Sequence, residues 1–259
     1  MNYEKVSHYH GFISIQYQYF CTTLFQEWLA TDEAKNTQKS FENVFLVPFP
    51  KAPVEIKVEL SLQDRFQIIA LKSVSQESGT SEPSRGIWKN TVLGSHFDTF
   101  YSDRYLTTLH LKRLHDVLAG TPYEHVIILV NTEHYGGGGI YNSYNLSYTG
   151  GSQFLPVVVH EFGHSFGGLG DEYTYGNDDP IYFDDTEPWE PNLTTKATAF
   201  IKWENLIKAG KAGLIEGGGY QEKGVWRGCE NCRMRTNEEP EFCAVCKQAL
   251  KELIDFYTE

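Results

Sequence analysis

The sequence is short of positive charge, of methionine and of long apolar runs. Its 22 lysines and arginines face 34 aspartates and glutamates, which leaves a formal net charge of −12. Such a charge repels a phosphate backbone and argues against nucleic acid as a partner. No run of 18 apolar residues occurs, so no membrane-spanning helix is expected. Residues 1–29 also lack the continuous apolar core and the small-residue cleavage site of a signal peptide.

What is present is enough to build a large core. Hydrophobic residues make up 41% of the 259-residue chain and aromatic residues 14%, so a disordered protein is excluded. The length suits one large domain, or a large domain with a small N-terminal extension. We predict an N-terminal segment of uncertain structure at 1–65, followed by a folded domain at 66–259.

The first half of that domain has the pattern of a sheet with a crossover helix. Residues 66–74 and 125–131 are apolar runs typical of buried strands, and helical spacing of leucines predicts a helix over 104–118. Four glycines at 136–139 are predicted to form a turn that leads to a further strand at 142–148. A phosphate-binding loop is not predicted, because its glycine spacing is missing. That turn either borders a groove that receives a peptide backbone or is simply tight.

The segment HEFGH at 160–164 carries the clearest chemical signal. His160 and His164 are four residues apart, so on a helix they lie on one face and can bind one metal ion. Glu161 lies about 100° further round the helix, where it can reach a metal-bound water without being a ligand. This pattern is typical of zinc hydrolases. The alternative, a core helix with two buried histidines, would leave Glu161 buried and unpaired.

A cluster of glycines predicts where the third ligand comes from. The glycines at 167, 168 and 170 favour a sharp helix exit directly after His164, since glycine reaches positive φ at no steric cost. With Gly168 as the turning residue, the motif extends to HExxHxxxGxxD and ends at Asp171. Asp171 is therefore the predicted third ligand, and its neighbour Glu172 is the competing carboxylate.

Methionine is the scarcest residue, with only Met1 and Met234 in the chain. Met234 lies in a Cys-Arg-Met-Arg segment about 70 residues after the helix, where it suits a methionine turn beneath the metal. A methionine that simply fills a core gap is the alternative. A C-terminal helix is predicted at 245–257.

The motif HEFGHSFGGLGDEY, together with SQESGTS at 75–81, LVN at 129–131, YGGGG at 135–139 and the Cys-Arg-Met-Arg segment, resembles the M64 (IgA peptidase) family of zinc metallopeptidases. The resemblance covers roughly residues 66–256. It implies an α+β, metzincin-like zinc peptidase domain with a twisted mixed sheet, an active-site helix and a C-terminal helix after a methionine turn.

The resemblance also implies a chemistry and a location. Zinc would be held by His160, His164 and Asp171, and Glu161 would serve as general base in the hydrolysis of peptide bonds in a protein or peptide substrate. An extracellular or cell-surface location follows from the family alone. Two other functions stay open: another zinc amide hydrolase, and a catalytically silent protein-binding module of the same fold.

The cysteines permit several states. Four of the five form two CxxC pairs, Cys229 with Cys232 and Cys243 with Cys246, and Cys21 is left over. Disulfides suit an exported protein, a second zinc site suits the paired spacing, and free thiols are the third alternative. The sequence does not indicate an oligomeric state.

Overall fold

The computed structural model describes residues 9–16, 67–176, 181–183 and 186–258. These residues form two compact units, and the division falls inside one helix, between Glu161 and Phe162. Most of the predicted N-terminal segment, including Cys21, lies outside the described residues. The described helices and strands show an α+β protein, as the sequence predicts. None of its described helices is both long and apolar enough to cross a membrane.

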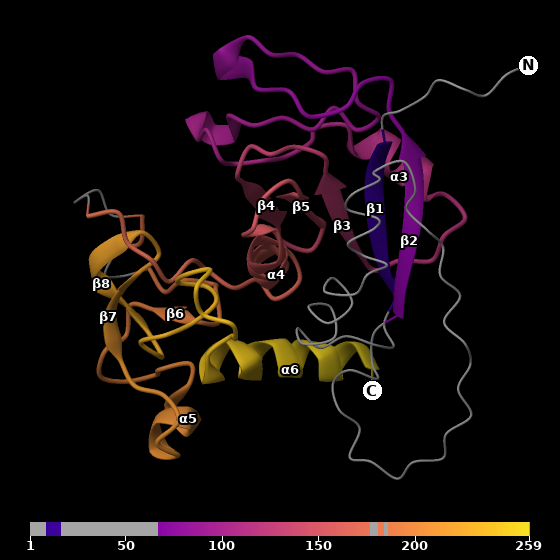
Figure 1. Cartoon of the computed structure of the whole chain (residues 1–259). Helices are drawn as coiled ribbons and strands as arrows, with labels where there is room; N and C mark the ends of the chain where they lie inside the picture. The colour runs from indigo at the N-terminus through magenta and orange to yellow at the C-terminus, as the bar shows by residue number, and fades with distance from the viewer. Residues whose placement is uncertain (1–8, 17–66, 177–180, 184–185, 259) are drawn as a thin grey trace, which may run out of the picture. The chain divides into compact units, whose positions relative to one another are not determined.

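The first unit is built on a five-stranded mixed sheet in the order β2-β1-β3-β5-β4 (Figure 1). Its strands are β1 (Tyr9–Gln16), β2 (Gln67–Val74), β3 (His125–Val130), β4 (Gly137–Ile140) and β5 (Tyr144–Tyr148). β3 and β5 run parallel, and the other neighbouring strands pair antiparallel. All six residues of β3 are buried, which is expected of the central strand of a covered sheet.

The core of this unit lies between the sheet and helix α3 (Leu111–Leu118). Alternate β3 residues Val126, Ile128 and Val130 belong to the same buried cluster as Leu114 and Leu118 of α3. The alternation follows from the two-residue period of a strand, which sends every second side chain to the same face.

The predicted helix over 104–118 was wrong at its start. Residues 105–107 are extended instead, because Tyr105 bridges to Gly137 and Thr107 bridges to His96. Backbone pairing with these distant segments overrides the local leucine spacing. The predicted glycine turn was also wrong, since Gly137–Ile140 is itself strand β4 and pairs with β5.

The glycines in β4 and directly before it are explained by close approach of another backbone segment rather than by a turn. A Cβ at Gly138 would lie 2.2 Å from the carbonyl oxygen of Leu106, and one at Gly136 would lie 2.2 Å from that of Arg104. Only a residue without a side chain lets the extended segment 104–106 run this close to the strand.

The second unit contains a three-stranded antiparallel sheet in the order β6-β8-β7. Its strands are β6 (Leu193–Thr194), β7 (Ile215–Gly218) and β8 (Gln221–Arg227), and its helices are α5 (Glu204–Lys208) and α6 (Ala244–Thr258). The buried residues of α6, which include Cys246, Leu250 and Ile254, recur every four positions and form one apolar stripe. The predicted C-terminal helix is therefore confirmed, with its bounds extended by one residue at each end.

Two short 3-10 helices, Pro83–Arg85 and Thr99–Tyr101, complete the described elements besides helix α4 (Phe154–Ser165), which carries the HEFGH segment. Three consecutive buried valines at 157–159 and the buried Phe162 anchor α4.

Candidate metal centre

Helix α4 and the residues directly after it bring three predicted site residues together. One donor atom from each of His160, His164 and Asp171 lies within 4.8 Å of the others. His160 and His164 are partly exposed and Asp171 is buried. The three residues belong to one continuous stretch of chain, so the grouping follows from the helix and its exit.

The helix exit depends on Gly168, which has a φ of +61°. Its N–H donates to the carbonyl of His164 at 3.0 Å, and the N–H of Leu169 donates to the carbonyl of Gly163 at 3.0 Å. A residue with a side chain is strained in this left-handed conformation. The chain therefore reverses within one turn and returns Asp171 to His164.

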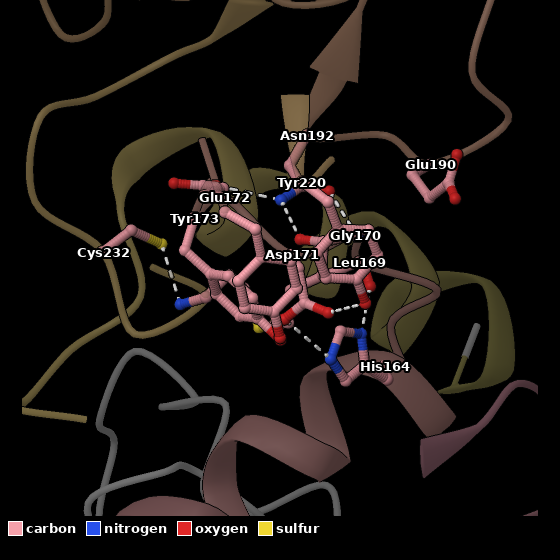
Figure 2. A network of polar contacts seen from close by, with 12 residues as sticks. His164, Leu169, Gly170, Asp171, Glu172, Tyr173, Glu190, Asn192, Tyr220 and Cys232 are labelled. Carbon is pink, nitrogen blue, oxygen red and sulfur yellow. Dashed lines mark hydrogen bonds and ion pairs between the residues drawn. The ribbon is translucent and has the colours of Figure 1, made fainter. Parts of the chain in front are cut away.

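The hydrogen bonds of His164 define which of its nitrogens faces Asp171. Nδ1 donates to the carbonyl of Leu169 at 2.6 Å, and Nε2 lies 3.2 Å from Asp171 Oδ1 (Figure 2). A ring that donates from Nδ1 carries a lone pair on Nε2 when neutral. Two lone-pair atoms then face each other, an arrangement that needs a cation or a proton between them.

The spacing and chemistry of these donors fit a tetrahedral metal ion. Ligand atoms about 2.0 Å from a tetrahedral zinc lie about 3.3 Å from one another, close to the 3.2 Å between His164 and Asp171. Metal-bound histidines usually donate a hydrogen bond from the ring nitrogen that does not bind the metal, often to a backbone carbonyl. His164 Nδ1 makes such a bond to the carbonyl of Leu169.

Asp171 is held by residues that sequence reasoning missed. The hydroxyl of Tyr220 donates to Asp171 Oδ2, and the N–H of Gly219 donates to the carbonyl of Asp171 at 2.7 Å. Burial, together with the Asp171 charge, raises the pKa of Tyr220 well above its usual range, so it stays a donor. Tyr220 lies at the turn between β7 and β8, about 50 residues beyond Asp171, and no local pattern relates the two.

Asn192 is a second missed residue, and it is fully buried. Its side chain accepts the N–H of Gly170 at 2.8 Å and donates to the carbonyl of Gly170 at 2.9 Å. The same amide nitrogen donates to Glu172 Oε1 at 2.9 Å. In Figure 2 this one side chain reaches both residues that flank Asp171.

Glu161 is partly exposed and lies against strand β4. A Cβ at Gly137 would lie 2.6 Å from Glu161 Oε1 and 2.7 Å from its Cγ. Gly137 therefore provides the room that the Glu161 side chain occupies.

Met234 packs against Gly163 of helix α4. It is fully buried, and a Cβ at Gly163 would lie 2.6 Å from its sulfur. The Met234 carbonyl also accepts the N–H of Glu172 at 2.8 Å. The segment around Met234 thus contacts both the helix and its exit.

Glu172 does not join the histidine group. Its carboxylate is fully buried and lies with the thiols of Cys232, Cys243 and Cys246, all four donor atoms being within 4.8 Å of one another. Burial raises the pKa of Glu172 to about 8, and hydrogen bonds from Cys243 and Cys246 lower the pKa of Cys232 to about 6.

Comparison with known proteins places the chain in a family. The family model described as IgA Peptidase M64 matches residues 52–212 and 208–254, and the one described as Peptidase M64 N-terminus matches residues 12–70. These matches indicate a peptidase, and its described residues include a candidate metal-binding group on and after helix α4. The chain belongs to peptidase family M64, a family of metallopeptidases. A search among curated proteins found no match.

Proposed function

We propose that the protein is a zinc-dependent endopeptidase, with zinc held by His160, His164 and Asp171 and with Glu161 as general base. One observation carries the proposal: three donor atoms typical of zinc lie within 4.8 Å of one another beside a partly exposed glutamate. Family membership supports protein substrates.

The partial exposure of His160, His164 and Glu161 supports a catalytic role for this centre. A catalytic zinc needs three protein ligands and one accessible position, whereas a structural zinc is enclosed by four. Bound zinc would polarise the scissile carbonyl and lower the pKa of the attacking water towards about 7.

The chain's own residues would move the proton and hold the geometry. Glu161 would accept the proton of the attacking water and deliver it to the leaving amine. Gly137 leaves the space that the Glu161 side chain occupies in this position. The hydrogen bond from His164 Nδ1 to Leu169 keeps Nε2 directed at Asp171, and Tyr220 keeps the Asp171 carboxylate in place.

A metzincin-like arrangement is part of the same proposal. It is supported by the glycine exit at Gly168, by a third ligand within seven residues of His164, and by Met234 packed under Gly163. Here the third ligand would be a carboxylate in place of the metzincin histidine. Export to the cell surface or beyond, suggested by the family resemblance, is tested by fractionating cells that express the full gene.

The test combines product analysis with one substitution. Wild-type protein incubated with a mixed protein substrate should yield internal cleavage fragments by mass spectrometry, and a chelator should abolish them. Glu161→Gln keeps the side-chain shape but removes the base, so activity should fall by about 10²–10⁴ while zinc content is unchanged. Glu252→Gln, on the exposed face of α6, is the matched control.

Each other outcome overturns part of the proposal. Near wild-type cleavage by Glu161→Gln would remove Glu161 from the mechanism. Cleavage of small amides but of no peptide would identify another zinc amide hydrolase. Tight binding of a protein without any cleavage would identify a silent binding module.

A further inference from the structure

We propose that Glu172, Cys232, Cys243 and Cys246 form a second zinc site, a closed structural one, and that Cys229 is not among its ligands. The site is distinct from the proposed catalytic centre and does not depend on it.

The four residues converge from three separate segments of the second unit. Glu172 follows the exit of helix α4, Cys232 lies in the loop after β8, and Cys243 and Cys246 lie at the start of α6. Their donor atoms all lie within 4.8 Å of one another. Cys232 Sγ and Cys246 Sγ are 3.6 Å apart, near the roughly 3.8 Å expected for two sulfurs about 2.3 Å from one tetrahedral zinc.

The interior position of Glu172 is costly without a cation. Its side chain is fully buried, and Cys232 and Cys246 are fully buried beside it. Glu172 Oε1 accepts hydrogen bonds from Asn192 and from the Cys246 thiol, but Oε2 has no hydrogen-bond partner in the described part of the chain. A buried carboxylate oxygen in this state needs either a proton or a cation beside it, and a metal ion would supply the cation.

The surroundings of Cys232 favour a thiolate, the form that binds metal. The backbone N–H groups of Met234 and Cys243 both point at its sulfur, at 3.4 and 3.3 Å. Backbone donors aimed at a charged acceptor stabilise it.

Charge balance is consistent with zinc in the cluster. Three thiolates and one carboxylate exceed the charge of a divalent ion by two. Two buried arginines, Arg227 and Arg233, interact electrostatically with Cys232, and Arg227 interacts with Glu172 as well. Zinc and the two guanidinium groups together neutralise the four ligands.

A disulfide explains the cluster less completely. A bond between any two of the three thiols would use two of the four converging donor atoms and would give no reason for the third thiol and the buried Glu172 carboxylate to lie with them. The start of α6 instead presents two cysteines in CxxC spacing to one point, as structural zinc sites do.

Cys229 is the obvious competitor for the fourth position, because it completes the second CxxC pair. It is partly exposed, lies beside Cys243 and donates weakly to the carbonyl of Lys211 at 3.9 Å. It is not among the residues whose donor atoms converge. Glu172 therefore takes the place that sequence spacing assigns to Cys229.

Zinc bound at this site would hold neighbouring segments of the chain in place. Glu172 follows Asp171 directly, so zinc bound at Glu172 would tie the segment that presents Asp171 to α6 and to the loop carrying Met234. The second ion would act as a positioning element for the catalytic ligand.

The experiment uses full-length protein carrying His160→Ala and His164→Ala, which removes the catalytic centre. Loaded at neutral pH under reducing conditions, this variant should keep about one zinc per chain, against about two in the wild type. Cobalt substitution in the same variant should give sulfur-to-cobalt charge-transfer absorption in the near ultraviolet. Because this readout needs no cysteine substitution, it does not depend on the folding of a mutated cluster.

Single substitutions in that background identify the ligands. Cys246→Ser should remove the remaining zinc, Glu172→Gln should weaken its affinity by at least about tenfold, and Cys229→Ser should leave it unchanged. Absence of zinc and of the cobalt band, or loss of two free thiols in the unreduced protein, would overturn the site in favour of a disulfide. Equal metal loss in Cys229→Ser, with none in Glu172→Gln, would overturn the assignment of Glu172.

Loss of the proposed catalytic function would be recognised separately. A wild type that binds only one zinc, which disappears with Cys246→Ser but not with His160→Ala, would reject the catalytic centre and keep the second site.

Discussion

Two candidate metal centres differ in burial and in donor chemistry, although each contains one of two residues that are adjacent in the sequence, Asp171 and Glu172. The first combines two partly exposed histidines with a buried carboxylate. The second combines three cysteines with a carboxylate, and all four are buried. An open site with nitrogen and oxygen donors suits catalysis, and a closed sulfur-rich site suits a structural ion.

The comparison shows how one short segment can serve both purposes. Asn192 holds Gly170 and Glu172, and the Met234 carbonyl accepts the N–H of Glu172. The backbone between the two centres is thus tied on both sides of Asp171, in addition to the hydrogen bonds that Asp171 itself accepts from Tyr220 and Gly219. Rigid support of this kind is what an active-site ligand requires.

The largest expected effect comes from removing one of the two adjacent carboxylates, Asp171, and comparing the result with removal of Glu172. Asp171→Ala should lower zinc affinity at the proposed catalytic centre and peptidase activity by more than about 100-fold, which exceeds the cost of removing an outer partner of a metal ligand. Glu172→Ala should cost less activity, because it acts only through the position of Asp171. Metal analysis and kinetics of both variants check this, and a larger loss in Glu172→Ala would exchange their roles.

Gly137→Ala tests the partly exposed centre, the one with the two histidines, without changing a proposed metal ligand. The added Cβ would meet the Glu161 side chain at 2.6 Å and displace this proposed base. A displacement of about 1 Å can cost up to about 100-fold in rate, so kcat should fall while zinc content stays at the wild-type value. Unchanged kcat would show that Glu161 does not act from the position seen against β4.

Tyr220→Phe removes the hydroxyl that donates to Asp171 Oδ2. Outer partners of metal ligands typically contribute about 10–100-fold to metal affinity. Zinc affinity at the proposed catalytic centre should therefore fall by that amount, and cobalt absorption from the proposed sulfur site should not change. Tyr175→Phe is the control, because Tyr175 stacks on the Tyr220 ring and its hydroxyl donates to the hydroxyl of Tyr173. Equal losses in both variants would assign the effect to ring packing.

Gly163→Ala should have the smallest effect, and this effect should be on the free energy of unfolding. The new methyl group would meet the Met234 sulfur at 2.6 Å, and overpacking of this kind costs about 1–3 kcal/mol. Gly213→Ala, where a Cβ meets nothing within 4 Å, should be close to neutral. Denaturant unfolding of the two variants measures the difference, and an equally stable Gly163→Ala would show that Met234 is not packed against the helix.

Local pattern determined much of the protein. The spacing of His160 and His164, the position of Glu161 and the glycine exit follow from helix geometry over a dozen residues. The strands at Gln67–Val74 and His125–Val130 and the C-terminal helix follow from apolar periodicity. Each of these is a relation between residues close in sequence, so elementary stereochemistry is sufficient to predict it.

Tertiary structure alone decided the rest, because the deciding partners are far apart in the chain. Residues 105–107 became extended through pairing with His96 and Gly137, against their helical spacing. Tyr220 and Asn192 reached the Asp171 segment from later loops, with no motif of their own. Glu172 lies with three cysteines 60 and more residues away in the sequence, and not with the nearby histidines. A buried carboxylate is stabilised by the donors and cations that the fold places around it. Sequence spacing does not specify those neighbours.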